Sequence, residues 1–167
     1  MPSRHSPIAA AVAQQIRAIR PGTILAIGPA ATDFLPTPAG GEQAVRVSTL
    51  RAPSSVEDLH GAGTVDLAVV AGLLEEHDKR SSEMVLGRVR DLHAGCMLLV
   101  VDVERAAANG WQPNDLFALG LERMSRAQEN GKSMELFGFD IRRYKTTPDW
   151  LNARYWANPQ LWDKFRW

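Results

Sequence analysis

The clearest pattern in the chain is an unbroken apolar run within residues 64–77, TVDLAVVAGLLEEH. After Asp66 the chain has no polar residue until it reaches a glycine at position 72. A run of this kind is typical of a strand buried on both faces of a parallel sheet, although a buried helical turn gives the same pattern. The β-branched pair Val69 and Val70 and the glycine that follows favour the strand.

Four other stretches also have the pattern of strands. Residues 23–28 and 96–103 are short runs of β-branched and other apolar residues, and residues 44–50 alternate between polar and apolar positions. In residues 133–143, Phe137, Phe139 and Ile141 recur at every second position.

Helices are predicted between these strands by caps and by apolar residues at helical spacing. Ser6 and Pro7 begin the first helix, which places Ile8, Val12, Ile16 and Ile19 on one face and ends before Pro21. A second helix begins at Ser81 and Ser82, carries Val85, Leu86, Val89 and Leu92 on one side, and ends at Gly95. A third is predicted over residues 115–128, capped by Asn114 and ended by Asn130 and Gly131.

Shorter turns complete the pattern. The prolines and glycines of residues 29–41 allow at most one helical turn, over residues 31–35. Ser54 or Ser55 caps a brief helix that ends at Leu59. Thr147–Pro148 and Asn158–Pro159 begin two short helices at the C-terminus.

Strands that alternate with helices predict a three-layer α/β sandwich with a mostly parallel sheet. The last strand follows a helix and precedes an irregular tail, so we expect it to run antiparallel at an edge. No repeat or linker divides the chain, and residues 1–167 therefore form one domain, with the aromatic-rich tail 147–167 packed on it.

Composition narrows the classes of protein that fit. The chain has 167 residues, enough for one compact domain, and its 19 basic residues equal its 19 acidic residues. Nucleic acid and acidic membranes are therefore not favoured partners. Cys96 is the single cysteine, which fits a reducing compartment, and no apolar run approaches the roughly 20 residues that span a bilayer. These features predict a soluble cytoplasmic protein.

The order of these elements resembles class I S-adenosylmethionine (SAM)-dependent methyltransferases. The resemblance covers residues 23–103 and implies a Rossmann-like sheet whose first strand ends in a glycine loop against the cofactor. Gly28 matches that glycine, Asp66 matches the acid that introduces the later strand, and Gly95 matches the turn before the next one. The implied cofactor-binding residues are Gly28, Pro29, Ala30, Ala71 and Gly72.

The part of the chain that would bind the cofactor, from the first strand to the second, departs from the family pattern in several ways. The first loop keeps one glycine, and Pro29 lacks a backbone donor. The second strand ends Ser48–Thr49–Leu50–Arg51, without the acid that holds the ribose in the family. The long helix after the first strand is missing. These departures indicate a shortened, degenerate member of the fold. The part from Trp111 onward is similar to an uncharacterised bacterial family, which implies no chemistry.

Two residues are candidates at the rim of the sheet, where ligands of open α/β folds bind. His77 follows the central strand beside Glu75, Glu76 and Asp78, but neighbouring residues do not converge on one point, so we predict a solvated loop and no metal site. Asp102 ends another strand, where it either contacts a ligand or caps the next turn through Glu104 or Arg105.

The C-terminal tail combines aromatic with basic residues. Such a composition suits packing over the sheet, a protein interface, or stacking on nucleic acid, in that order of preference. The candidate interface residues are Trp150, Tyr155, Trp156, Trp162 and Trp167.

Three functions remain open from the sequence. The first is a degenerate, non-catalytic methyltransferase-like protein that acts through a ligand or a protein partner. The second is a small SAM-dependent methyltransferase with an atypical cofactor loop. The third is an interaction module, as a homodimer or with another protein, that uses the tryptophan-rich tail.

Overall fold

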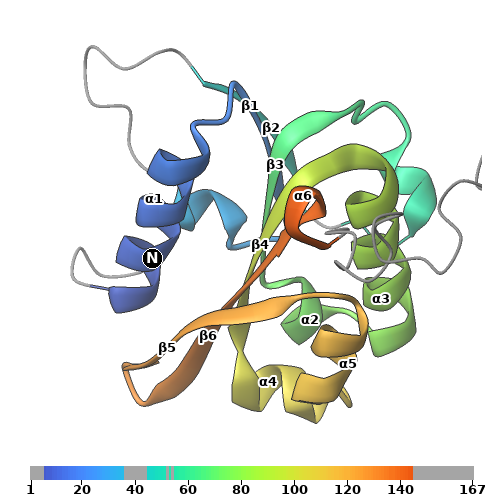
Figure 1. Ribbon diagram of the computed structural model, residues 1–167. Coiled ribbons are helices and arrows are strands. Elements are labelled where there is room, and N and C mark those ends of the chain that lie inside the picture. The colour runs from blue at the N-terminus through green and yellow to red at the C-terminus, as the bar shows by residue number, and fades with distance from the viewer. Residues whose placement is uncertain (1–5, 36–44, 52, 54, 145–167) are drawn as a thin grey trace, which may run out of the picture.

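A six-stranded sheet forms the centre of the molecule (Figure 1). The computed structural model describes residues 6–35, 45–51, 53 and 55–144. The strand order is β2-β1-β3-β4-β6-β5, in which β2, β1, β3 and β4 are parallel and β6 is antiparallel to both of its neighbours. The strands are β1 (Thr23–Ile27), β2 (Arg46–Leu50), β3 (Val65–Ala71), β4 (Ala94–Asp102), β5 (Glu122–Glu129) and β6 (Lys132–Asp140).

Helices cover both faces of this sheet, which confirms the predicted three-layer α/β architecture. One face packs against α1 (Pro7–Ile19) and the short turn η1 (Ala31–Phe34). The other face packs against η2 (Val56–Leu59), α2 (Leu73–Glu76), α3 (Lys79–Arg88), the π-helical turn η3 (Val89–His93), α4 (Val103–Ala108) and α5 (Pro113–Ala118). A last turn, α6 (Ile141–Tyr144), follows β6.

Burial on both faces explains the apolar runs. Along β3, Leu67 and Val69 belong to the core beneath α1, whereas Ala68 and Val70 belong to the core beneath α3. All four side chains are fully buried. Alternate residues of a strand point to opposite faces, so a strand covered on both sides needs apolar residues throughout.

Two predicted caps are confirmed and two are wrong. The predicted cap Asn114 lies inside helix α5, which begins at Pro113 and is capped by Gln112. Ser6 caps α1, because its hydroxyl accepts a hydrogen bond from the Ala9 amide at 2.9 Å, and Ser55 caps η2. The second helix, however, is capped by Asp78 and not by Ser81 or Ser82, since the Asp78 carboxylate accepts from the Ser81 amide at 3.0 Å. That helix changes to a π-helical turn at Val89, and Leu92 is consequently 51% exposed instead of buried.

The prediction of one helix over residues 115–128 is wrong. Helix α5 ends at Ala118, and the chain then enters strand β5. Asn130 and Gly131 both have positive φ angles, 51° and 76°, which is the geometry of a two-residue hairpin turn. This turn reverses the chain into β6, and pairing with β6 holds residues 122–129 as a strand.

Strand β6 was also expected at an edge, and this placement is wrong. β6 lies between β4 and β5, so β5 forms that edge of the sheet. The strand ends at Asp140, and Ile141 begins α6 with 42% of its surface exposed. The antiparallel direction of β6 is confirmed.

The predicted helices at Thr147–Pro148 and Asn158–Pro159 lie outside the described residues, as does the whole of the tail 147–167. No helix in the described part of the chain is long and apolar enough to cross a bilayer.

Candidate functional site

The carboxyl ends of the parallel strands meet at one edge of the sheet. β2 lies on one side of β1 and β3 lies on the other, so the direction in which the chain adds strands reverses at β1. Open α/β sheets bind ligands outside the carboxyl ends of their strands at such a switch point. The candidate site is therefore the edge formed by the loops that follow β1, β3 and β4.

The loop after β1 lies directly on the end of β3. Gly28 has a φ of 97°, and a Cβ atom at this position would be 2.3 Å from the carbonyl oxygen of Ala71. Gly72 has a φ of 84°, and a Cβ atom there would be 2.8 Å from Cγ of Pro29. Both glycines are therefore required by contacts within the chain itself.

The backbone amides of this loop are already used. The Gly28 amide donates to the carbonyl oxygen of Leu50 at 2.9 Å, and the Ala30 amide donates to that of Ala71 at 3.3 Å. Pro29 has no amide hydrogen. In the loop 28–30, no N–H group remains for a ligand.

A pocket of about 210 Å³ lies beside this closed loop, at the carboxyl ends of β3 and β4. It brings together four predicted site residues, Ala30, Ala71, Gly72 and Asp102, whereas Gly28, Pro29 and His77 do not line it. The full lining consists of Ala30, Asp33, Phe34, Ala71, Gly72, Glu75, Val100, Asp102, Arg105, Glu129, Asn130, Lys132 and Met134. We call it the rim pocket.

Glu75 is a carboxylate of the rim pocket with one buried oxygen. Its Oε1 accepts a hydrogen bond from the Asp102 amide at 2.7 Å, whereas its Oε2 is buried without a hydrogen-bond partner among the described residues. Burial raises the pKa of Glu75 above its usual 4.5, and the nearby negative charge of Asp102 acts in the same direction.

Asp102 has a structural role, as the cap interpretation predicted. Its Oδ1 accepts from the Arg105 amide at 3.3 Å, which caps α4, and its Oδ2 lies 3.5 Å from Nζ of Lys132. The Asp102 side chain is only 8% exposed. Asp102 also lines the rim pocket, and its contact with a ligand stays a prediction.

Glu129 and Lys132 are pocket residues that the sequence reasoning missed. Both lie beside the hairpin turn at Asn130–Gly131, and that dipeptide was the signal that could have placed them. The Glu129 carboxylate accepts from the Ser6 hydroxyl and the Ile8 amide, each at 2.8 Å. It thereby joins the hairpin to the first turn of α1.

Asp66 lies at the opposite end of the sheet from the rim pocket. Its Oδ2 accepts from the amides of Gly22 and Thr23 and from the Thr23 hydroxyl, each at 2.9 Å. These hydrogen bonds lower the pKa of Asp66, with the Thr23 hydroxyl contributing most. The acid that introduces β3 therefore ties the start of β3 to the start of β1.

His77 lies outside the pocket, half-buried after α2, where its amide donates to the Leu73 carbonyl oxygen at 3.2 Å. In the described residues, no group of three or more histidine, cysteine, aspartate or glutamate side chains could hold a metal ion. The interface candidates Trp150, Tyr155, Trp156, Trp162 and Trp167 lie outside the described residues.

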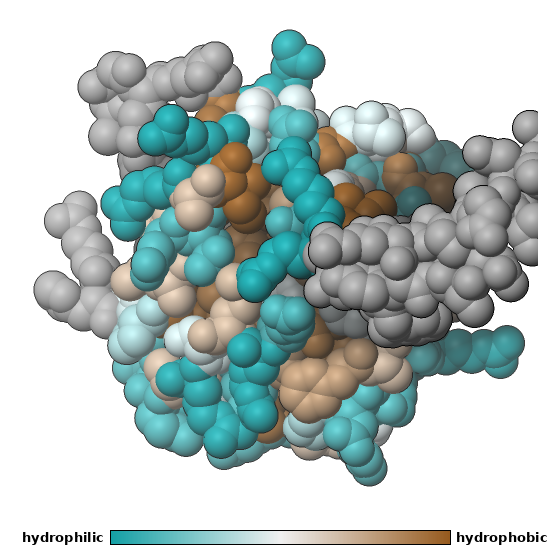
Figure 2. Space-filling view, in the orientation of Figure 1, coloured by the Kyte–Doolittle hydropathy of each residue, from teal (hydrophilic) through white to brown (hydrophobic). Residues whose placement is uncertain are grey.

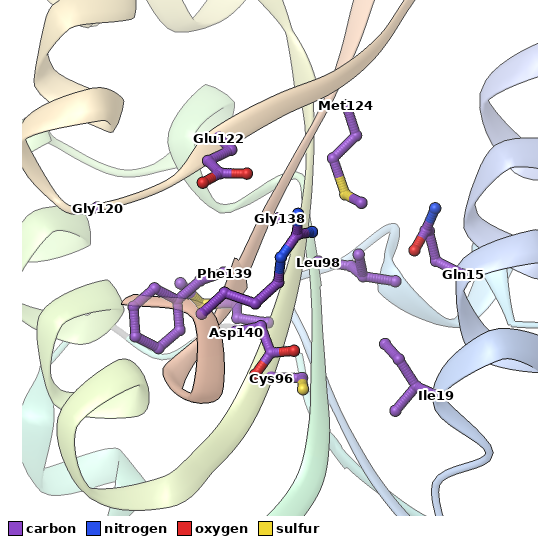
Figure 3. Close-up of a pocket in the computed structure, with 12 residues that line it drawn as sticks. Gln15, Ile19, Cys96, Leu98, Gly120, Glu122, Met124, Gly138, Phe139 and Asp140 are labelled. Atoms are coloured by element: carbon purple, nitrogen blue, oxygen red, sulfur yellow. The ribbon is translucent and has the colours of Figure 1, made fainter. Parts of the chain in front are cut away.

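A second, smaller pocket of about 100 Å³ lies between α1 and the strands β4, β6 and β5 (Figure 3). Gln15 and Ile19 of α1 face Cys96 and Leu98 of β4 across it. Burial, followed by the charge of Asp140, raises the pKa of the Cys96 thiol, so this cysteine lacks the thiolate character of a nucleophile.

Residues 6–167 match the model of a family described as "Family of unknown function (DUF6231)", and the chain belongs to that family. No curated protein matches the sequence.

Two solved structures are similar in backbone arrangement. One is an O-methyltransferase family protein from Burkholderia thailandensis, with 15% identity and a TM-score of 0.47 over 80% of this chain. This chain spans only 55% of that protein. The other is the methyltransferase domain of bacterial-CtHen1-CN, with 9% identity and a TM-score of 0.48 over 79% of this chain and 97% of that one. At these values neither similarity bears on what this chain binds.

Proposed function

We propose that this member of DUF6231 is a methyltransferase-like protein without methyltransferase activity, which acts through a small ligand or a protein partner. The observation that carries the proposal is the contact between Gly28 and Ala71, where a single added Cβ would lie 2.3 Å from the carbonyl oxygen. A dinucleotide or nucleoside cofactor uses the crevice at this switch point. Here the backbone of Ala71 occupies the space beside Gly28, which supports a crevice with little room for such a cofactor.

The use of backbone amides supports the same conclusion. Rossmann-like folds hold a cofactor with free N–H groups of the first loop and with the N-terminus of the helix that follows. The N–H groups of Gly28 and Ala30 bond to carbonyl oxygens of the sheet, and only the short turn η1 follows. The loop therefore lacks the free N–H groups and the helix N-terminus that would bind SAM.

The size of the rim pocket also favours a ligand smaller than SAM. Sites for drug-sized molecules are commonly about 300–1,000 Å³, and the rim pocket is about 210 Å³. Four carboxylates, from Asp33, Glu75, Asp102 and Glu129, and two cations, from Arg105 and Lys132, line it. A small polar ligand fits this lining better than a nucleoside does.

The decisive experiment is isothermal titration of the full chain with SAM and with S-adenosylhomocysteine. We expect no saturable binding of either ligand at concentrations up to about 1 mM, which corresponds to a binding free energy weaker than roughly −4 kcal/mol. Micromolar binding of either ligand would contradict the proposal.

The alternative function is a small SAM-dependent methyltransferase with an atypical loop. One observation favours it: Ala30, Ala71, Gly72 and Asp102 share a single pocket on the rim, as a cofactor site requires. If SAM binds, Ala30→Leu should abolish binding by filling the pocket. Ala107→Leu, on the exposed side of α4, is the matched control and should leave binding unchanged.

A further inference from the structure

Strand β2 differs from the other parallel strands because most of its residues are exposed, and only Leu50 packs against the core. Four of its five residues are exposed, and Val45, immediately before it, and Val47 are 41% and 46% exposed. Parallel strands in α/β proteins are normally covered on both faces. The predicted alternation of residues 44–50 therefore does not correspond to a buried and a solvated face.

The outer edge of β2 also presents backbone groups that have no partner among the described residues. The Arg46 amide donates to Gly22, and the Leu50 carbonyl accepts from Gly28, so the even-numbered residues of β2 face β1. Backbone direction alternates along a strand. The N–H and C=O groups of Val45, Val47 and Thr49 consequently point away from the sheet, and no described strand lies beyond β2.

The two edge strands of the sheet, β2 and β5, differ in how well they are protected against pairing with another chain. Natural edge strands carry charges, bulges or prolines that prevent pairing with another chain. β5 has charged side chains at Glu122, Arg123, Arg126 and Glu129, and its register shifts between Arg123 and Ser125. β2 has a single charged residue, Arg46, and a regular register.

We propose that β2 pairs with β2 of a second copy of this chain, antiparallel about a two-fold axis at Val47. Val47 then lies opposite Val47 of the partner subunit, and Val45 lies opposite Thr49 of the partner subunit. Every outward N–H and C=O group of these residues gains a partner, and the two Val47 side chains pack against each other.

Charge is compatible with this register. Arg46 lies opposite Ser48 of the partner subunit, so the two Arg46 side chains are not directly opposed. The interface is isologous, as in most homodimers. Since it involves one short strand from each copy, we expect weak association, with a Kd on the order of 10 µM.

The test is sedimentation of the full chain between about 1 and 300 µM, a range that brackets this Kd. Wild type should pass from monomer to dimer. Val47→Glu and Val47→Lys should each weaken association at least tenfold, because like charges meet at the axis. An equimolar mixture of the two variants should restore dimers, since Glu then faces Lys.

Met84→Glu is the matched control, because Met84 is also 46% exposed but lies on α3, and it should leave association unchanged. Circular dichroism confirms that each variant is folded. A monomeric wild type at the highest concentration, a dimer that survives Val47→Glu, or a variant mixture that stays monomeric would each overturn the proposal. A dimer that is lost only when residues 147–167 are removed would overturn it too, in favour of the tail.

Discussion

At the scale of single residues, Glu75 and Asp66 show how two acids near the same strand take opposite roles. Asp66 accepts three hydrogen bonds at 2.9 Å, which stabilise its charged form and lower its pKa. Glu75 has one buried oxygen without a partner among the described residues, and burial raises its pKa. The charge of Asp66 therefore contributes to stability, whereas the charge of Glu75 opposes it.

The pH dependence of stability should reveal the cost of the Glu75 charge. Because its pKa is higher in the folded state than the usual 4.5, the folded state binds the proton more tightly, and stability falls as the pH rises from 4.5 through the folded pKa. Glu75→Gln keeps an acceptor for the Asp102 amide and removes the charge. We expect the variant to be more stable than wild type at pH 7, by about 1 kcal/mol, and equal to it near pH 4.

Urea unfolding between pH 4 and pH 8 measures this difference. Glu76→Gln, at the exposed neighbouring position, is the control and should follow wild type at every pH. A Glu75→Gln variant that loses stability at pH 7 would show that the ionised carboxylate has a partner.

At the scale of elements, the junction of β1 and β3 depends on glycine for packing. Gly28 lies against the backbone of Ala71, and Gly72 lies against Pro29. The family resemblance implied that the glycine of this loop lies against a cofactor. In the structure, the end of β3 packs against the loop at Gly28. A bulky residue at Gly28 therefore disturbs the fold whether or not a ligand binds.

A pair of alanine substitutions separates packing from backbone strain. Gly28 and Gly61 have φ angles of 97° and 93°, but a Cβ at Gly61 has nothing within 4 Å. Gly61→Ala should cost about 1 kcal/mol, from strain alone. Gly28→Ala should cost roughly 2 kcal/mol more, because the backbone of β3 must move. Chemical denaturation gives both values, and equal losses would contradict the packing role.

At the scale of the whole molecule, Glu129 links the β5–β6 hairpin to helix α1. It lies at the tip of the β5–β6 hairpin and accepts from Ser6, 123 positions earlier, and from Ile8 in the first turn of α1. A carboxylate at a helix N-terminus is favoured by the helix dipole as well as by these bonds. The face of the molecule in Figure 2 is mostly hydrophilic, with apolar side chains visible between polar ones.

Removing this link should weaken the attachment of α1. We expect Glu129→Ala to lower the free energy of unfolding by about 2 kcal/mol, since hydrogen bonds to a partly buried charge are lost. Amide hydrogen exchange should also quicken in α1 more than in β3 and β4. Gln128→Ala, an exposed neighbour, should change neither quantity. Unchanged exchange in α1 would show that the helix is held by its apolar face alone.

Local patterns determined most of the architecture. The apolar runs of β3 and β4, the Ser6 cap and the alternation of strands with helices were sufficient for the α/β class, because burial on two faces and capping act over a few neighbouring residues. The family resemblance implied Ala30, Ala71 and Gly72, and the strand pattern gave Asp102. The structure brings these four residues to one pocket, since parallel strands end together.

Only the tertiary structure decided what depends on pairing between distant residues. Residues 122–129 have apolar spacing that a helix would also accept, and their pairing with β6 makes them a strand. The contact of Gly28 with Ala71 and the hydrogen bond from Ser6 to Glu129 join positions far apart in the sequence. The Glu75 oxygen that has no partner among the described residues depends on burial. Periodicity carries no information on such contacts, because their energies arise only when the elements pack together.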